Sequence, residues 1–227
     1  MKKIAIVVPT YNEEENVNSI YTRLSNVMAN QLNKYDYEIV YIDNYSTDKT
    51  RNLIELLCKQ DSHVKAIFNS RNFGFVRSTF YGLMQPDADC TFLVFADMQD
   101  PPELLVEFIR KWEEGYKVII GIKQNSKENK LMFALRTFYY KVIGRISDSE
   151  QIEHFNGFGL YDRDFIKIIR KLDDPFPYLK GIVSEFGIKR TEVYYEQSKR
   201  EAGKTHFNLF KLYDVAMIGV TDRKSVV

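Results

Sequence analysis

The sequence predicts an α/β fold in which a parallel β-sheet is covered by helices on both faces. Three observations lead to this fold class. Short apolar runs alternate with amphipathic segments through the first half of the chain. The links between them are short, and such alternation is typical of parallel sheets. Apolar residues make up 44% of the 227 residues, enough for the core of one domain or of a domain with a small appendage.

Five apolar runs predict buried strands, because a strand that is covered on both faces reads as a continuous apolar stretch. The predicted strands are Ile4–Val8, Tyr37–Ile42, Val64–Phe68, Phe92–Ala96 and Lys117–Ile120.

The segments between these runs predict helices, because their apolar residues recur at helical spacing. Thr47 is expected to cap the second helix, with Asp48 in its first turn. The third helix is expected to begin after Gly74 and to end at about Met84. The fourth spans Pro102 to Trp112, and a proline is tolerated at its start. The apolar faces are Val17, Ile20, Leu24, Val27 and Met28 in the first helix, and Leu53, Ile54, Leu56 and Leu57 in the second.

Polar loops follow the first four predicted strands. The carboxyl ends of parallel strands meet at one edge of a sheet, where open α/β sheets bind ligands. We therefore expect one binding site built from four loops. These loops are Pro9–Glu13, Asp43–Thr47, Ser70–Gly74 and Asp97–Asp100.

The fourth loop is a candidate metal site. Asp97 and Gln99 are an acid and an amide one residue apart, and oxygen ligands of this kind hold hard cations. The alternative is that Asp100 caps the following helix and no ligand is bound, since acids are common at helix starts.

Several functional classes are excluded by composition or by missing motifs. Dinucleotide-binding and P-loop sites need glycine for close approach of the backbone to phosphate, and Pro9–Glu13 has none. Lys and Arg number 32 against 31 Asp and Glu, which argues against a general nucleic-acid binder. Cys58 and Cys90 form no motif and are expected to be buried thiols in a reducing compartment.

The N-terminal apolar run stops at Pro9, too early for a signal peptide, and no stretch reaches the ~18 apolar residues of a membrane span. A soluble or peripheral cytoplasmic protein is expected from these features.

The four loop motifs together resemble those of the family 2 glycosyltransferases. The most similar members are polyprenyl-phosphate sugar transferases, such as dolichol-phosphate mannose synthase and bacterial undecaprenyl-phosphate glucosyltransferases. The resemblance extends from residue 3 to about residue 220. It implies a GT-A fold with a Rossmann-like sheet, an inverting mechanism, a nucleotide-sugar donor, and Mg²⁺ or Mn²⁺ as cofactor. The motifs are Val8–Glu14, Asp43–Asp48, Ser70–Gly74 and Asp97–Glu103.

The resemblance also implies roles for individual residues. Asp97 and Gln99 would hold the metal on the donor diphosphate, and Arg200 and Lys204 would hold phosphates beside it. A capped helix start is the alternative for Tyr11 and Glu13. The implied nucleotide-binding residues are Pro9, Tyr11, Glu13, Asp43, Asn44, Ser46, Asn72 and Asp97.

The chain departs from the family pattern at three motifs. Asn44-Tyr45 stands where Asp-Gly is usual, Phe95 stands for the first acid of Asp-x-Asp, and Gly157 stands where many members carry Asp. Without a base at 157, the acceptor is expected to be a phosphate, which is already ionised because its second pKa is roughly 6. Otherwise another acid, Asp97 or Glu185, would serve as the base. A lone His154 is expected to be structural.

The second half of the chain predicts two amphipathic helices, one inside the catalytic domain, which we place at residues 1–206, and one after it. Residues 131–147 have a basic face and a broad aromatic face, which suits a helix on an anionic membrane surface. The alternative is a helix packed on the core. Residues 207–220 are too short to span a bilayer and are expected to lie close to the membrane. The segment 221–227 matches nothing in the family and is expected to be a non-native or truncated tail. Arg200–Phe207 resembles the family's Arg-x-x-Gly-x-Ser loop, with a solvated basic turn as the alternative.

These features together predict an inverting, metal-dependent glycosyltransferase. It would move a sugar from a UDP- or GDP-sugar to a polyprenyl phosphate at the cytoplasmic face of the plasma membrane. The longer protein would continue into transmembrane helices, and a homo-oligomer is compatible with the sequence. Two alternatives stay open. One is transfer to a glycan or lipid hydroxyl in polysaccharide synthesis, and the other is a non-catalytic nucleotide-sugar-binding module, which Phe95 and Gly157 favour.

Overall fold

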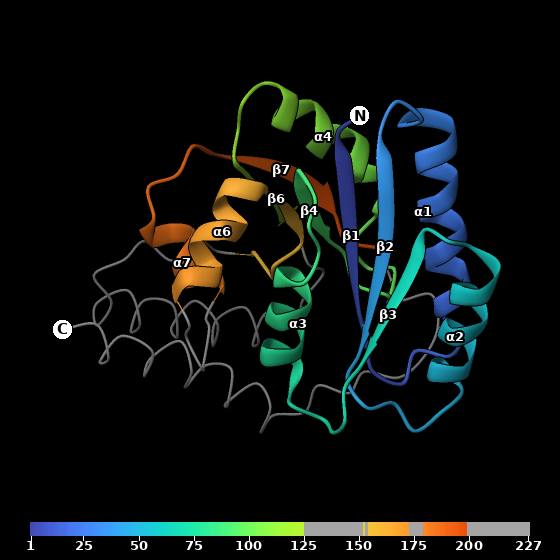
Figure 1. Ribbon diagram of the computed structural model, residues 1–227. Coiled ribbons are helices and arrows are strands. Elements are labelled where there is room, and N and C mark those ends of the chain that lie inside the picture. The colour runs from blue at the N-terminus through green and yellow to red at the C-terminus, as the bar shows by residue number, and fades with distance from the viewer. Residues whose placement is uncertain (125–151, 153, 173–178, 199–227) are drawn as a thin grey trace.

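A computed structural model describes residues 1–124, 152, 154–172 and 179–198. The predictions for Arg200, Lys204 and segments 131–147, 207–220 and 221–227 lie outside these residues. The described part is built on a seven-stranded sheet with the order β3-β2-β1-β4-β6-β5-β7, with helices on both faces (Figure 1). The strands are β1 (Lys3–Thr10), β2 (Asp36–Asp43), β3 (Val64–Phe68), β4 (Cys90–Leu93), β5 (Val118–Gln124), β6 (Gly159–Asp162) and β7 (Arg190–Glu196).

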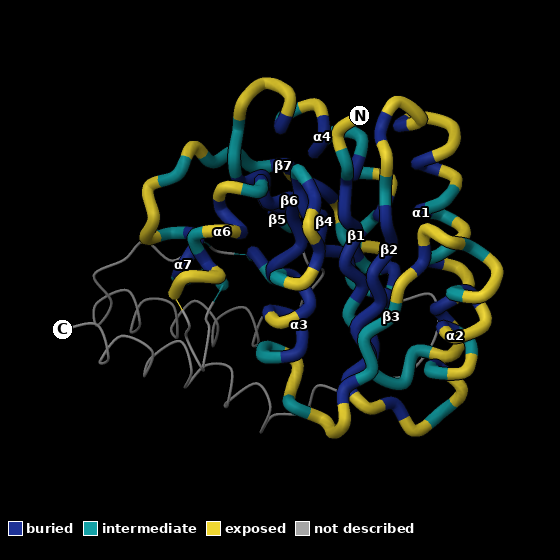
Figure 2. Tube along the Cα trace, in the orientation of Figure 1, coloured by how far each residue is buried: buried dark blue, intermediate teal, exposed yellow. Residues whose placement is uncertain are grey.

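The helices divide between the two faces of the sheet. Apolar side chains of α1, α2 and α4 pack with Ile4, Ile6 and Val8 of β1 in one core. Those of α3, α6 and α7 pack with Val7 in a second core, because neighbouring residues of a strand face opposite sides. The sheet is buried between these layers (Figure 2). The helices are α1 (Val17–Gln31), α2 (Thr50–Gln60), α3 (Phe75–Met84), η1 (Pro102–Leu104), α4 (Leu105–Glu113), α6 (Arg163–Leu172) and α7 (Leu179–Glu185).

The five predicted strands all run in the same direction, but β6 and β7 are not among them. β1 pairs in parallel with both β2 and β4, and β2 pairs in parallel with β3. β6 lies between β4 and β5 and runs antiparallel to both, so the sheet is mixed. An apolar run in a sequence predicts that a strand is buried, and it carries no information on the direction of the strand.

Two local predictions were wrong. β4 ends at Leu93, so Val94–Ala96 lie beyond the strand. α2 begins at Thr50 without a side-chain cap, and Thr47 instead donates its backbone N–H to Asn12 Oδ1 at 2.8 Å. A contact with the first loop therefore replaces the expected cap.

The two cysteines differ in burial. Cys90 is buried, which raises the pKa of its thiol well above the ordinary value, whereas Cys58 is half-buried. Within the described ranges, no helix has both the length and the apolar character needed to cross a bilayer.

Candidate functional site

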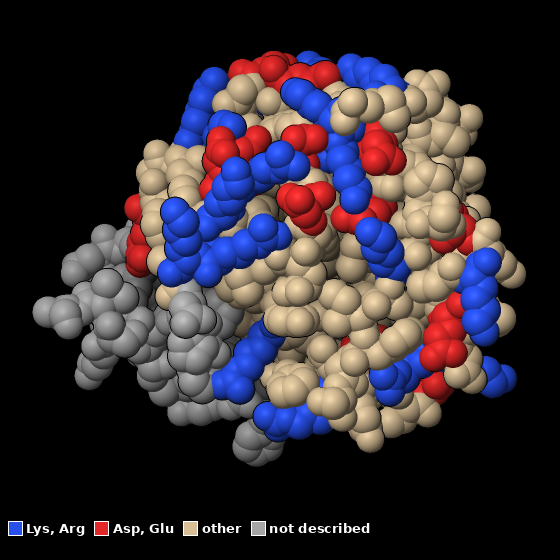
Figure 3. All heavy atoms as spheres, viewed as in Figure 1, with Lys and Arg blue, Asp and Glu red and all other residues tan. Residues whose placement is uncertain are grey.

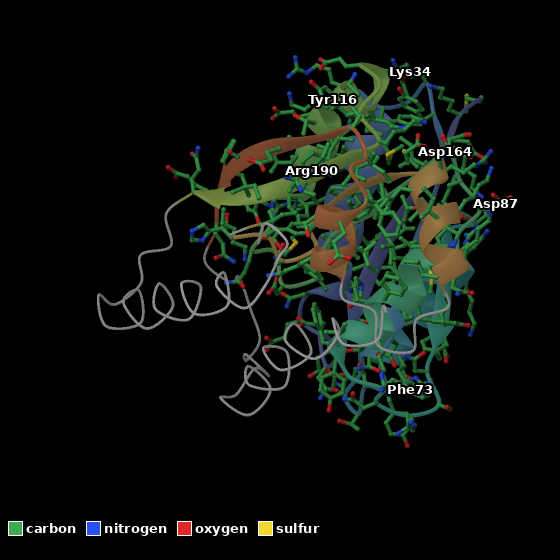
Figure 4. All side chains as sticks on the ribbon, turned by 90° about the vertical axis from the view of Figure 1, so that its left-hand side faces the viewer. Lys34, Phe73, Asp87, Tyr116, Asp164 and Arg190 are labelled. Carbon is green, nitrogen blue, oxygen red and sulfur yellow. The ribbon has the colours of Figure 1, made fainter. Side chains whose placement is uncertain are left out.

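The four predicted loops gather at one edge of the sheet. β2, β1 and β4 are parallel neighbours, so their carboxyl ends point the same way, toward the lower edge in Figure 1. Figure 4 shows this separation in a second view: Phe73 of the third loop lies at the bottom, whereas Lys34 and Tyr116, in links at the amino ends of strands, lie near the top. The sequence prediction of a common edge is therefore confirmed for the loops that follow β1 to β4.

Hydrogen bonds join the first loop to the second. The backbone N–H of Asn12 donates to Ser46 Oγ at 2.8 Å, and Asn12 Oδ1 accepts from the Thr47 N–H at 2.8 Å. The Glu13 N–H donates to Thr50 Oγ1 at 2.8 Å, at the start of α2. The Glu13 and Thr50 contact fixes where the first loop turns away from the sheet.

Asn44 joins the second loop to the third. Its Nδ2 donates to Asn72 Oδ1 at 2.9 Å, and its Oδ1 accepts from the Phe73 N–H at 3.0 Å and from Asn69 Nδ2 at 3.2 Å. An aspartate here could not donate to Asn72, so the amide suits this junction better than the acid that is usual in the resembled family. The first three loops consequently form one hydrogen-bonded unit.

Asp43 shapes the second loop from inside. Its side chain is 0% exposed, and its carboxylate accepts from the Ser46 N–H at 3.1 Å and from Ser46 Oγ. Arg51 Nε lies 3.3 Å from Asp43 Oδ2 and balances the charge. Asn44 and Ser46 are buried as well, whereas Tyr45, 45% exposed, and Thr47 face outward from this loop.

The fourth loop is fastened by residues from the far half of the sheet. Asp100 is 1% exposed, and its carboxylate accepts from Asn156 Nδ2 at 2.7 Å and from Tyr195 Oη. Lys123 Nζ lies 3.6 Å from Asp100 Oδ1. Burial, together with the negative charge of Asp100 and its hydrogen bond, raises the pKa of Tyr195, so that its hydroxyl stays a donor. This internal role differs from the helix cap considered as the alternative for Asp100.

Four non-glycine residues of the described part have left-handed backbones: Asn12 with φ 55°, Tyr45 with φ 70°, Met98 with φ 60° and His154 with φ 58°. Three of them lie in the first, second and fourth loops. The conformation costs roughly 1–2 kcal/mol for a residue with a Cβ atom, and such strain concentrates at functional sites. Only Asn12 carries a sequence signal, because Asn tolerates this region better than other residues. Tyr45 and Met98 were missed.

Comparison with known proteins identifies the family. The model for "Glycosyl transferase family 2" matches residues 5–185. The chain belongs to this family. The resemblance seen in the loop motifs is thereby confirmed.

Relatives named as glycosyltransferases agree with family 2 membership. The uncharacterized glycosyltransferase YkcC of Bacillus subtilis is 33% identical over 219 residues, covering 96% of this chain and 67% of the relative. The bactoprenol glucosyl transferase of Shigella phage SfV is 31% identical over 220 residues, covering 96% and 71%.

The fold is shared with solved glycosyltransferases at low identity. Mannosyltransferase PcManGT of Pyrobaculum calidifontis, solved with GDP-Man and Mn²⁺, has a TM-score of 0.58 at 15% identity, covering 96% of this chain and 69% of the other. Glucosyl-3-phosphoglycerate synthase of Mycobacterium tuberculosis, solved with Mn²⁺, UDP and glucosyl-3-phosphoglycerate, has a TM-score of 0.56 at 15% identity, covering 95% of this chain and 76% of the other. The GT-A fold predicted from the sequence is confirmed.

The predicted metal ligands of this family 2 chain lie together in the fourth loop. Asp97 Oδ1 accepts from the Gln99 N–H at 3.2 Å, and the Gln99 carbonyl accepts from the Ser198 N–H at 3.1 Å. Among the residues that the structure describes, no three His, Cys, Asp or Glu side chains gather to form an all-protein metal cage. One carboxylate and one amide still fit Mg²⁺ or Mn²⁺, since such ions usually keep several waters and bind through one or two carboxylates plus substrate phosphates.

Two positions where the family pattern has an acid, residues 95 and 157, have apolar surroundings in this chain. Phe95 packs with Phe75 of α3, with ring centroids 5.5 Å apart. Gly157 is buried with φ 105°, a conformation that suits glycine. Glu185, one of the substitute bases considered, is exposed at the far end of α7.

Charges on the visible face are mixed. Lys and Arg side chains alternate with Asp and Glu, and neither sign dominates (Figure 3). The described surface on this side therefore does not form the continuous basic stripe that marks a nucleic-acid binder.

Proposed function

We propose that this family 2 enzyme transfers a sugar, with inversion, from a nucleotide-sugar donor to a polyprenyl phosphate. The observation that carries the proposal is the set of four loops at the carboxyl edge of β1, β2, β3 and β4, with Asp97 on the fourth. The relatives named bactoprenol glucosyl transferases support a lipid-carrier acceptor.

The donor would lie across this edge with its nucleoside on the first three loops. Pro9, Tyr11 and Glu13 would cradle the nucleoside, and Asp43 with its partners would keep the second loop in shape. Asp97 and Gln99 would hold Mg²⁺ or Mn²⁺ on the diphosphate. A bound divalent ion neutralises the charge of the departing nucleoside diphosphate. The crystallised neighbours that contain Mn²⁺ with UDP or GDP-Man support this arrangement.

The acceptor side favours a phosphate over a hydroxyl. A hydroxyl needs a base near its oxygen, and Gly157 supplies none. A phosphate monoester is ionised at neutral pH and attacks without losing a proton. Its oxygen forms a bond to the anomeric carbon while the bond from that carbon to the donor diphosphate breaks, and the nucleoside diphosphate leaves with the electron pair. Arg200 and Lys204 would hold phosphates in this step.

The location of the enzyme follows from this acceptor. A polyprenyl phosphate lies in a membrane, so we propose peripheral association at the cytoplasmic face, helped by residues 131–147 and 207–220. Homo-oligomerisation is compatible with this arrangement.

The decisive experiment is a transfer assay with paired acceptors. The purified chain is incubated with radiolabelled UDP-glucose or GDP-mannose, Mn²⁺, and either undecaprenyl phosphate or undecaprenol. We expect labelled lipid only with the phosphate, and loss of product with EDTA. Product with undecaprenol instead would favour the hydroxyl-acceptor alternative.

A second candidate function is a nucleotide-sugar-binding module without transfer. Phe95 and Gly157 favour it, because each removes a carboxylate that the family usually carries. The same assay separates the two candidates. Saturable donor binding with no product on any acceptor, and no donor hydrolysis, would favour the module.

A further inference from the structure

Tyr45 is held in a conformation that its residue type disfavours. Its φ of 70° lies in the left-handed region, where glycine is at ease and a residue with a Cβ is strained. Its neighbours fix it there, because Asn44 bonds to the third loop and the Ser46 side chain to the first loop and to Asp43. Glycine would satisfy the backbone, so the presence of a large aromatic ring needs another reason.

Packing does not supply that reason. The Tyr45 side chain is 45% exposed, and the guanidinium of Arg51 lies 5.9 Å from its ring centroid. Arg51 is already placed without Tyr45, since it pairs with Asp43 at 3.3 Å and lies 4.9 Å from the ring centroid of Phe68. The Tyr45 ring is thus a half-exposed aromatic surface on a rigid support.

The position of this ring matches one part of the donor. The second loop lies between the first and third loops, which the proposed function gives to the nucleoside, while the diphosphate belongs to Asp97 on the fourth loop. Asp43, the acid expected to contact the base or ribose, is buried and occupied by Ser46 and Arg51. Tyr45 and Thr47 are the exposed residues of this loop; the Thr47 N–H is bonded to Asn12 of the first loop, and of the two only Tyr45 offers an aromatic face to a base.

We propose that Tyr45 is a nucleotide-binding residue whose ring stacks on the nucleobase of the donor. This inference rests on the proposed function, since it requires a nucleotide at this edge of the sheet. Stacking uses the face of the ring and tolerates different bases, because every base has a π-face.

The test compares Tyr45→Gly, Tyr45→Ala and Tyr45→Phe in the full chain, by calorimetric titration with UDP, with GDP, and with inorganic pyrophosphate, each in Mn²⁺. The Gly and Ala variants should both bind the nucleotide on the order of 10-fold more weakly, as expected for loss of one stacked base. Their affinity for pyrophosphate should match that of the parent. The Phe variant should bind like the parent, because stacking needs the ring and not the hydroxyl.

Stability separates this role from a structural one. Tyr45→Gly removes the strain and should melt at a higher temperature than Tyr45→Ala, which keeps it. If the ring acts on the base, the two variants weaken nucleotide binding alike in spite of this difference. Tyr81→Ala, which removes a 49% exposed tyrosine from α3, is the matched control and should change nothing.

Two results would overturn the inference. One is parental nucleotide affinity in both the Gly and the Ala variant, and the other is an equal loss of pyrophosphate affinity, which would mean that Tyr45 only shapes the loop. Failure of the parent chain to bind either nucleotide would instead refute the proposed function itself, and the role of Tyr45 with it.

Discussion

Phe95 occupies the surroundings into which a side chain at residue 157 would project. A Cβ atom built on Gly157 would lie 3.8 Å from Cζ of Phe95 and 3.5 Å from Cδ2 of Leu93. Phe95 stands where the family usually has the first acid of Asp-x-Asp, and Gly157 stands where many members carry Asp. The two departures therefore lie side by side, and the surroundings that they share are apolar. A carboxylate restored at only one of them would face apolar neighbours.

We expect Phe95→Asp and Gly157→Asp to be coupled. Gly157→Asp alone should destabilise the protein by roughly 1–3 kcal/mol, because φ is 105° and a carboxylate would be buried without a partner. With Phe95→Asp also present the ring is gone and water can enter, so the double variant should be more stable than the sum of the single effects, by about 0.5–3 kcal/mol. Urea unfolding of the four proteins gives this coupling energy. Simple additivity would mean that the two positions do not communicate.

Asp97→Asn should abolish transfer while the fold survives. An Asn oxygen can still accept from the Gln99 N–H, so the loop keeps this bond, but the charge that attracts a divalent ion is lost. We expect at least a roughly 100-fold fall in turnover, the scale of several kcal/mol that a catalytic metal supplies. Steady-state assays over a Mn²⁺ series, with circular dichroism as the folding check, would measure this. Parental activity in the variant would remove Asp97 from the metal site.

Replacing Asp100 should weaken donor binding as well as stability, whereas replacing Asp162 should lower stability alone. Both carboxylates are buried and paired, since Asp162 accepts from Trp112 Nε1 at 2.7 Å and pairs with Lys117 at 2.9 Å. Asp162 ends β6, which runs antiparallel, and so lies at the edge away from the loops. Asp100→Asn and Asp162→Asn should each cost about 1–3 kcal/mol of unfolding free energy, as expected when a buried charged partner is removed.

Only Asp100→Asn should also weaken binding of Mn²⁺ and UDP, because only Asp100 fastens the loop that carries Asp97. Titrations of the two variants at a temperature where both are folded provide the comparison. Equal affinities in both variants would show that Asp100 is purely structural.

Lys180 should make the free energy of unfolding rise with pH in the alkaline range. Burial, followed by the positive charge of Lys123, lowers its pKa to about 8 from the ordinary 10.5. In this window the unfolded chain binds more protons than the folded one, so the contribution of Lys180 to stability rises from pH 8 to pH 10.5. Below pH 8 the folded protein carries the full penalty of a charge that is partly removed from water.

Lys180→Met should therefore be more stable than the parent at pH 7, and the difference should shrink by pH 9.5. Chemical unfolding of both proteins at the two pH values measures it, with Lys59→Met on α2 as the exposed control. A difference that does not change with pH would contradict the lowered pKa.

The sequence predicted the architecture where local pattern decides it. The apolar residues of β1 and the spaced face of α1 are visible because each element buries one recurrent set of side chains. The prediction that Thr47 caps α2 was wrong, because a hydrogen bond with Asn12, far away in the chain, outweighed the local preference of Thr for a cap position. β6 was not among the five predicted strands, and its antiparallel direction depends on its pairing with β4 and β5.

The sequence predicted the location of the candidate site, but not the hydrogen bonds and ion pairs within it. Loop composition showed where Asp43 and Asp97 would lie. That Asp43 would be buried by Ser46 and Arg51, and that Asp100 would join Asn156 and Tyr195, depends on contacts between distant segments. Such contacts leave no periodic trace in the sequence.

The fastening of the fourth loop by Tyr195 and Ser198 has a consequence for biosynthesis. A ribosome makes the amino end first, so β1 to β4 and three joined loops can assemble while the rest of the chain is still being translated. The segment bearing Asp97 cannot be secured until β7, the last described strand, has emerged and aligned beside β5. The loop proposed to hold the metal and the diphosphate would thus be secured last, after the loops proposed to hold the nucleoside.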